Sequence, residues 1–348
     1  LYIKLDKRLD VPLYFSQTVA NGVTIDWGDG NAQTEDGTGN LNVTHTYATG
    51  GDYVIKLFPA SGCTLGLGHG SSTTLFIGGS TGYRYMLYKV EIGQRVTSIG
   101  NYAIYGCYAL SSISIPSGMT SIGNSAFYNC YSLSSISIPS GVESIGTYAF
   151  YTCRSLLSVS IPSGATSIGN NAFQNCYALS SISIPSSVTS IGTYVFQNCY
   201  ALSSISIPSG VASIGDYMFN SCTALSSISI PSGVTSIGGS AFSGCNSLSS
   251  ISIPSGVTSI GIYAFQSCSA LSSISIPSSV TSIGNNAFNS CTFVKEYHFQ
   301  RNTPPTLGGT NVFYGIPSDC IIYVPTASVD AYKAATYWSA QASIIVGE

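Results

Sequence analysis

The chain has 348 residues, of which 44% are hydrophobic and only 7% are charged, and its formal net charge is −3. This content is ample for a buried core, whereas the 11 Lys and Arg residues form no cluster and therefore exclude nucleic acid and anionic membranes as expected partners. No apolar run reaches the roughly 20 residues of a membrane-spanning helix, so we expect no membrane insertion. Because the sequence starts at Leu1 without a Met or a signal-like segment, we expect a mature or trimmed fragment.

Residues 1–86 have no long period and are rich in turn residues, which predicts a small β-sandwich. The expected strands cover residues 2–5, 13–15, 23–27, 42–47, 53–58 and 73–77. The segment Val23-Thr-Ile-Asp-Trp27-Gly-Asp-Gly30, followed by His45-Thr-Tyr47 and Gly51-Asp-Tyr-Val-Ile55, resembles the PKD-like immunoglobulin-type domain. The resemblance implies that Trp27 lies in the core, that residues 28–30 form a tight hairpin turn and that residues 45–47 form the opposite strand. The sequence after Pro59 departs from that family's pattern.

Four acidic residues of this region could be imagined as calcium ligands: Asp26, Asp29, Glu35 and Asp36. A complete D-x-D-x-D-G loop is missing, and Asp beside Gly is common in hairpin turns for backbone reasons. We therefore interpret these residues as turn residues and expect no metal site.

The segment Gly78-Gly-Ser80-Thr-Gly82 matches the G-x-S-x-G pattern of a hydrolase nucleophile elbow. Such an elbow needs a strand before it, a helix after it and a downstream acid and histidine in a parallel sheet. Here a Gly-rich connector leads into repeats, and His298 is the only downstream histidine. An enzyme with Ser80 as its nucleophile is therefore the least favoured of three functional hypotheses. We predict a non-enzymatic chain without a cofactor.

A repeat of 23 residues organises the chain from Leu87 to about Val324. One unit reads Leu110-Ser-Ser-Ile-Ser-Ile-Pro-Ser-Gly-Met-Thr-Ser-Ile-Gly-Asn-Ser-Ala-Phe-Tyr-Asn-Cys130. The same step of 23 residues separates the nine cysteines Cys107, Cys130, Cys153, Cys176, Cys199, Cys222, Cys245, Cys268 and Cys291. A fixed period of this length with L-x-x-I-x-I at its head predicts a right-handed leucine-rich-repeat solenoid.

Within one unit, residues 110–115 are expected to form a strand, which Pro116 ends because proline has no N–H for the ladder. Residues 119–122 would form a short extended return, and residues 126–130 a single helical turn because Ala-Phe and Cys are spaced at i and i+3 or i+4. If successive coils share one interior, Phe127, Phe150 and Phe173 must line up as one buried column.

The nine repeat cysteines share one phase of the solenoid, so their side chains run parallel in a column instead of converging as a disulfide requires. A straight column cannot surround a tetrahedral metal ion either. We therefore predict buried, reduced thiols that fill space. Cys63 and Cys320 lie outside the column, and the sequence leaves their state open.

The units L-S-S-I-S-I-P-S-G-V-T-S-I-G-x-x-A-F-x-x-C resemble the BspA-like leucine-rich repeats of bacterial surface proteins over residues 87 to about 300. The resemblance implies an extracellular protein, secreted or held on the cell surface. Some members of that family are described as adhesins for host matrix proteins, which implies a binding role without naming a ligand for this chain.

The outward positions of the strands are nearly always Ser, as in Ser111, Ser112 and Ser114, and such a face offers few anchors for a partner. Tyrosines gather instead around the A-F-x-x-C segments, and we take seven of them as the candidate ligand-binding residues: Tyr102, Tyr105, Tyr108, Tyr128, Tyr131, Tyr148 and Tyr151. A Tyr ring combines a flat face with a polar tip, which suits contact with a glycan or a protein. The alternative is that neighbouring rings simply stack from repeat to repeat.

Residues 301–348 are interpreted as an irregular last repeat and a cap. A short helix is expected over residues 327–335, with Thr326 as its N-cap. Val329, Tyr332 and Trp338 would then cover the open end of the core.

The complete prediction is a mainly β chain with three parts: a PKD-like sandwich at 1–86, a BspA-like solenoid at 87–300 and a cap at 301–348. The leading functional hypothesis is a non-enzymatic cell-surface adhesin that presents the solenoid to a host extracellular-matrix protein or glycan. The alternative is a structural spacer that displays another domain away from the cell surface, because nearly uniform repeats supply length without surface variety.

Overall fold

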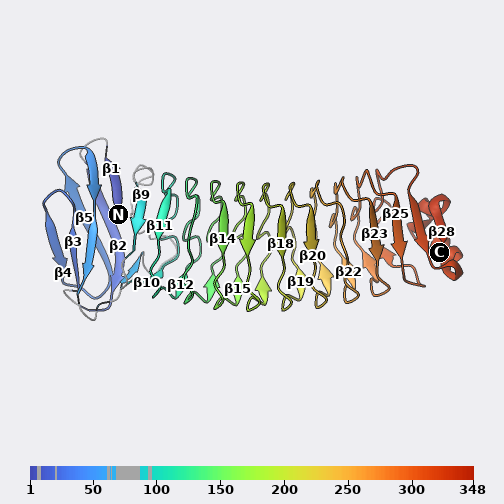
Figure 1. The fold of residues 1–348 in the computed structure, drawn as a ribbon, viewed down its shortest axis with the longest axis horizontal. Coiled ribbons are helices and arrows are strands. Elements are labelled where there is room, and N and C mark those ends of the chain that lie inside the picture. Colours follow the sequence, from blue (N-terminus) through green and yellow to red (C-terminus); the bar gives the residue numbers. More distant parts are fainter. Residues whose placement is uncertain (6–8, 20–21, 61–62, 64, 68–86, 93–95) are drawn as a thin grey trace. The chain divides into compact units, whose positions relative to one another are not determined.

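The computed structural model describes residues 1–5, 9–19, 22–60, 63, 65–67, 87–92 and 96–348 (Figure 1). The chain divides into two units, Leu1–Leu179 and Ser180–Glu348. Strands and turns make up almost all of both units. Among the described residues, helix occurs only in three short segments near the C-terminal end, so the predicted mainly β solenoid is confirmed.

The N-terminal strands are β1 (Tyr2–Leu5), β2 (Leu9–Gln17), β3 (Val23–Asp26), β4 (Ala32–Glu35), β5 (Gly39–Tyr47), β6 (Gly51–Val54), β7 (Lys56–Pro59) and β8 (Leu65–Leu67). In one sheet β2 pairs with β5 along its full length, and in another β3 lies between β4 and β7. The expected strand at 73–77 falls outside the described residues.

Trp27 and Tyr47 form the centre of this N-terminal region. Both side chains are fully buried, and the Tyr47 hydroxyl donates a hydrogen bond of 2.6 Å to the Trp27 carbonyl. Gly28 and Gly30 have φ values of 78° and 95°, which glycine adopts without strain, in the hairpin between β3 and β4. The expected positions of Trp27, the hairpin and the strand with His45 are confirmed, while the PKD-like family assignment stays a prediction.

Two N-terminal strands pair directly with the first coil of the solenoid (Figure 1). Strand β1 runs antiparallel to β9 (Leu87–Glu91), and β8 runs parallel to β10 (Val96–Ile99). The N–H and C=O groups at the start of the repeat sheets therefore have partners, which protects the sheet edges. The domain boundary at residue 86 stays a prediction, but strands on its two sides are hydrogen-bonded.

Each coil contributes up to two strands. The first series contains β11 (Ser112–Ser114), β14 (Ser158–Ser160), β16 (Ser181–Ser183), β18 (Ser204–Ser206), β20 (Ser227–Ser229) and β23 (Ser273–Ile276). The second contains β12 (Ser121–Ile122), β13 (Ser144–Ile145), β15 (Ser167–Ile168), β17 (Ser190–Ile191), β19 (Ser213–Ile214), β21 (Ser236–Ile237), β22 (Ser259–Ile260) and β24 (Ser282–Ile283). Pairs such as Ile122 with Ile145, and Ile237 with Ile260, are parallel and in register at one repeat step.

The interior of the coils is a column of phenylalanine rings. Phe127, Phe150 and Phe173 are fully buried, and their successive centroids lie 5.1 and 5.3 Å apart with planes within 4° of each other. In the second unit the rings of Phe196, Phe219, Phe242, Phe265 and Phe288 repeat this stack at 5.3–5.6 Å. The predicted shared interior is therefore confirmed within each unit.

The expected helical turn at 126–130 is wrong, because this side of the coil consists of β-turns. Ser125 and Asn129 have φ values of 54° and 60°, and a left-handed residue interrupts a right-handed helix. The backbone N–H of Phe127 instead donates to the Ala149 carbonyl of the next coil at 2.8 Å. We call this part of each coil, residues 124–132 and their equivalents, the turn side.

All eleven cysteines are buried thiols, as predicted for the nine in the column, and Cys63 and Cys320 are buried as well. The Cys153 thiol donates to the Phe127 carbonyl at 3.2 Å, and most other repeat cysteines make the same bond one repeat along. Burial raises the pKa of the Cys176 thiol to about 12, so it remains protonated at neutral pH. Each such thiol fills space and partners a carbonyl.

The C-terminal end contains the parallel ladder β23, β25 (Glu296–Phe299), β27 (Ile321–Val324) and β28 (Ile345–Gly347), with β26 (Thr306–Leu307) beside β24. Three short helices follow β27: η1 (Thr326–Ser328), α2 (Val329–Ala334) and η2 (Trp338–Ile344). Tyr332 and Trp338 are buried against Phe299, as expected of a cap. The expected N-cap is wrong, because the Thr326 hydroxyl donates to the Glu348 carbonyl at 3.0 Å and caps no helix.

Candidate functional site

The seven tyrosines predicted as binding residues all lie on the turn side of the unit Leu1–Leu179. We call them together the tyrosine surface: Tyr102, Tyr105, Tyr108, Tyr128, Tyr131, Tyr148 and Tyr151. They come from consecutive coils, so the repeat step brings equivalent positions next to one another.

The central column of the tyrosine surface is a stack of three rings. Tyr105 and Tyr128 lie 4.6 Å apart with planes at 9°, and Tyr128 and Tyr151 lie 4.5 Å apart with planes at 16°. The rings therefore cover one another's faces, and the three side chains are half-buried. Burial, reinforced by the neighbouring hydroxyls of Tyr151 and Tyr105, raises the pKa of Tyr128 to about 12, so its hydroxyl stays a hydrogen-bond donor.

Tyr102 and Tyr148 flank this column. Both have a left-handed backbone, with φ values of 59° and 57°. The Tyr148 ring meets Tyr151 edge to face at 5.5 Å and is 38% exposed, which makes Tyr148 the most accessible ring of the tyrosine surface.

A second column runs beside the first and contains Tyr108 and Tyr131, whose centroids lie 4.8 Å apart. The next position in this column is Arg154, whose guanidinium carbon lies 4.5 Å from the Tyr131 centroid and 5.6 Å from that of Tyr177. Arg154 is not among the site residues predicted from the sequence. The available signal was that it occupies the repeat phase of Tyr108 and Tyr131 and is the only Lys or Arg between residues 96 and 294.

The structure brings the predicted tyrosines together and also shows the stacking that the sequence left as the alternative. Ring faces in the central column are occupied by neighbouring rings, whereas the tyrosine side chains as a whole are only half-buried and Arg154 is exposed. This arrangement can supply several hydrogen bonds and one positive charge to a partner. A binding role for these residues stays a proposal.

The outward face of the repeat strands, which we call the strand side, carries mainly rows of hydroxyl groups instead of the large side chains that usually dominate binding. The Ser111 hydroxyl donates to the Tyr88 carbonyl at 3.1 Å, and the Thr120 hydroxyl donates to the Thr97 carbonyl at 3.1 Å, each across one repeat step. Along β16, β18 and β20 of the second unit lies a shallow groove of about 540 Å³ that is lined by Ser and Ile alone. The described residues of that groove thus provide neither a charge nor an aromatic ring.

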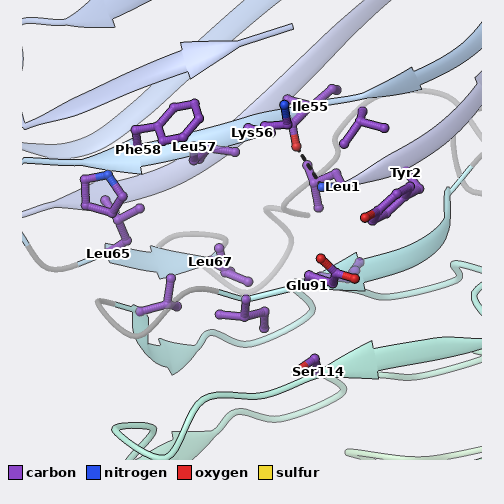
Figure 2. Close-up of a pocket in the computed structure, with 15 residues that line it drawn as sticks. Leu1, Tyr2, Ile55, Lys56, Leu57, Phe58, Leu65, Leu67, Glu91 and Ser114 are labelled. Carbon is purple, nitrogen blue, oxygen red and sulfur yellow. Dashed lines mark hydrogen bonds between the residues drawn. The ribbon is translucent and has the colours of Figure 1, made fainter. Parts of the chain in front are cut away.

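A cavity of about 530 Å³ lies between the N-terminal strands and the first coils (Figure 2). Apolar side chains such as Leu57, Leu65 and Leu67 contribute most of its lining. Its charged residues have other partners: the Lys56 ammonium lies 3.7 Å from Asp26, and the Glu91 carboxylate lies 2.6 Å from Lys89. The described lining contains neither a Cys nor a His, so it offers no pairing of a nucleophile with a base.

Two acidic residues near the first hairpin, Asp26 and Asp29, accept hydrogen bonds from the backbone of its turn. The Asp26 carboxylate accepts a bond of 2.9 Å from the Gly28 amide, and Asp29 accepts one of 3.1 Å from the Asn31 amide. The other Asp29 oxygen lies 2.7 Å from His45. In the part of the chain that the structure describes, no three potential ligands gather as a metal site would require. The G-x-S-x-G segment at 78–82 lies outside the described residues.

None of the helices among the described residues has the length and hydropathy needed to cross a bilayer. No curated protein sequence matches the chain. Solved structures that are similar to it include a leucine-rich repeat protein from Bacteroides ovatus, which is 24% identical, covers 75% of this chain and 84% of its own, and has a TM-score of 0.41. For a leucine-rich cell surface protein from Faecalibacterium prausnitzii the corresponding values are 25%, 74%, 89% and 0.35. For a leucine-rich repeat protein from T. pallidum they are 27%, 53%, 78% and 0.37.

The repeats themselves match a family model over residues 77–203 and 190–318, which together make up more than half of the chain. That model describes the BspA-type leucine-rich repeat region. Its span contains the phenylalanine column, the cysteine column and the tyrosine surface. The chain therefore belongs to the BspA-type leucine-rich repeat family.

Proposed function

We propose that the chain is a non-enzymatic, extracellular binding protein of the adhesin type, which uses the tyrosine surface to bind a host extracellular-matrix protein or glycan. The observation that carries this proposal is the gathering of seven tyrosines and one arginine on one side of three coils, in a repeat whose other outward positions are mostly Ser and Thr. Membership of the BspA-type family supports it.

The stacked arrangement favours binding through a reduced entropic cost. An exposed Tyr ring normally loses rotamer freedom when a partner fixes it. Because the rings of Tyr105, Tyr128 and Tyr151 already hold one another at 4.5–4.6 Å, their hydroxyls are positioned before a partner arrives. Tyr and Arg are also the residue types that most often dominate the binding energy of protein interfaces.

The test uses the full chain on arrays of extracellular-matrix proteins and of glycans. A combined Tyr105→Phe, Tyr128→Phe and Tyr148→Phe variant keeps the stacked rings and removes three hydroxyls. We expect saturable binding by the wild type and a loss of roughly tenfold or more in the variant, since each lost hydrogen bond costs about 0.5–1.5 kcal/mol. The matched control is the triple change Tyr194→Phe, Tyr217→Phe and Tyr263→Phe in the second unit, which leaves the tyrosine surface intact.

The absence of saturable binding to any array component would contradict the proposal. Equal affinity of the wild type and the tyrosine-surface variant would contradict the assignment of the site. A loss in the control variant as large as in the test variant would do the same.

The second candidate function is a spacer, and the rows of hydroxyl groups favour it. Where Thr and Ser side chains donate to carbonyls one repeat away, as Thr258 does to Thr235 at 3.2 Å, the surface is satisfied internally and needs no partner. A chain with two whole repeats deleted from the second unit would then keep any binding measured on the arrays. Only the distance that the chain spans would change. Binding that disappears with those repeats would contradict the spacer.

A further inference from the structure

Arg154 is the single positive charge of the regular repeats. Between residues 96 and 294 the sequence contains no other Lys or Arg, and its acidic residues there are only Glu143 and Asp216. Among the described residues Arg154 has neither an ion-pair partner nor a side-chain hydrogen bond, although its side chain is exposed on the turn side. The N–H groups of this guanidinium are therefore available to a partner.

The position of Arg154 is fixed by aromatic rings. Tyr131 precedes it by one repeat step and Tyr177 follows by one, so the two rings lie on opposite sides of the guanidinium, at 4.5 and 5.6 Å from its central carbon. Cation–π contacts of this kind cover the flat faces of a guanidinium and leave its N–H edges uncovered. An edge held in this way matches the two oxygens of a carboxylate.

The same coil carries a second departure from the repeat. Leu157 stands where neighbouring units have Ser134 and Ser180, and its side chain is 55% exposed. Arg154 lies on the turn side, and Leu157, three residues later, stands at the position of Ser111 where the strand side begins, with the buried Leu156 before it. One coil thus combines a fixed guanidinium with an exposed apolar side chain, whereas adjacent coils offer Tyr and Ser at these positions.

We infer that Arg154 is the anchor for an acidic side chain of a protein partner, with Leu157 receiving an apolar side chain of the same segment. This inference rests on the proposed function and narrows the class of partner from a protein or a glycan to a protein. Sugars bind aromatic side chains through open ring faces, but here the faces of Tyr128 and Tyr131 are covered by neighbouring rings and by Arg154. A carboxylate beside an apolar group is common in polypeptides and complements both Arg154 and Leu157.

The test pans a phage-displayed library of random peptides on the full chain. We expect the selected peptides to carry Asp or Glu beside an apolar residue. For the tightest peptide, the Kd is measured by fluorescence anisotropy against the wild type and Arg154→Tyr, and again with its acidic residue replaced by the matching amide. Tyr is the residue at this phase in neighbouring coils, so Arg154→Tyr is expected to keep the fold and the stacked column.

The expected result is a rise in Kd of roughly 10- to 100-fold for either change alone, because a hydrogen bond to a charged group is lost, and little further rise when both are combined. Leu157→Ser is expected to weaken binding by a smaller factor. The control Lys333→Gln removes one positive charge from the helix α2 and is expected to leave the Kd unchanged.

Selected peptides without a carboxylate, or an unchanged Kd with Arg154→Tyr, would overturn the inference. If the same variant still bound matrix proteins on the array, the proposed function would stand without it. Loss of binding by Arg154→Tyr confined to carboxylated or sulfated glycans would also overturn the inference, because the partner would then be a glycan. A wild type that bound nothing on the arrays or in the library would end both proposals.

Discussion

Two residues in almost every repeat have a left-handed backbone, and the side chains at these positions differ in how well they tolerate it. The second of them is Asn129, Asn175 or Asn198 in several units, and Asn adopts this conformation readily. Thr152 has the same conformation, with φ at 60°, although a β-branched residue is strained there. Thr152 directly follows Tyr151, so the last coil of the tyrosine surface contains a β-branched residue in a left-handed conformation.

Thr152→Asn is expected to raise the free energy of unfolding by about 1 kcal/mol, because it removes strain of that order. Chemical denaturation of the full chain measures the change. The reciprocal substitution, Asn129→Thr, places the strained residue in the preceding coil and is expected to lower the stability by a similar amount. Equal stability of all three proteins would show that the positive φ carries no cost at this position.

At the scale of the element, the period of the sequence is sufficient to predict the strands and the interior phenylalanine column. The short strands and the alignment of Phe127 with Phe150 both follow from identical letters at a fixed step. The turn side did not follow, since Ala126, Phe127 and Cys130 have the same spacing in a helical turn and in consecutive β-turns. The distinguishing signal was Asn, Ser or Gly before nearly every repeat Cys, which favours a left-handed residue at that place.

Removal of one ring from the column tests its contribution to stability. Phe150→Ala is expected to lower the free energy of unfolding by about 3–5 kcal/mol, because it leaves a cavity between two stacked rings. The control is the same change at Phe293, which is 66% exposed and should alter the stability by less than about 0.5 kcal/mol. Thermal and denaturant unfolding of both variants decides between a shared interior and independent coils.

The C-terminal ladder contains a pH-dependent contact. His298 of β25 lies 2.9 Å from Glu348 and 3.2 Å from Glu296, and its ring stacks on Tyr323 at 4.9 Å. Burial lowers the pKa of His298, but the hydrogen bonds to Glu348 and Glu296 outweigh it, so the pKa is raised above its usual 6.5. A raised pKa in the folded state means that the protonated form stabilises the fold.

This stabilisation is complete below pH 6.5 and is lost as the pH rises through the raised pKa of His298. The wild type is therefore expected to unfold at a higher temperature than His298→Gln, and this difference in unfolding temperature should be larger at pH 5.5 than at pH 8.5. Hydrogen exchange at β25 and β27 over the same range locates the effect. Parallel pH profiles of the two proteins would contradict a role for this histidine.

At the scale of the whole molecule, the sequence predicted the family and the solenoid but not how the N-terminal strands join it. The pairing of β1 with β9 links residues about 85 positions apart, and local patterns do not specify such long-range partners. The candidate site was predicted in part. The abundance of tyrosine in these coils is visible in the sequence, whereas the role of Arg154 is apparent only from its contacts with Tyr131 and Tyr177.

The scarcity of charge predicts different salt responses for folding and for binding. With 7% charged residues and ion pairs that are mainly exposed, the full chain should keep its unfolding temperature within about 2 °C between 0.05 and 0.5 M NaCl. Binding of an acidic peptide through Arg154 should weaken over the same range. Differential scanning fluorimetry and anisotropy on one protein sample measure both, and a large shift in unfolding temperature would contradict the first expectation.

The in-register pairing of equivalent residues, such as Ile122 with Ile145, also bears on how such a protein changes over generations. A duplication or loss of one whole unit of 23 residues gives every backbone group a new partner identical to the old one. An insertion of a single residue has no such replacement and displaces the entire following coil. The number of coils can therefore change by whole units while the pairing within the core is kept.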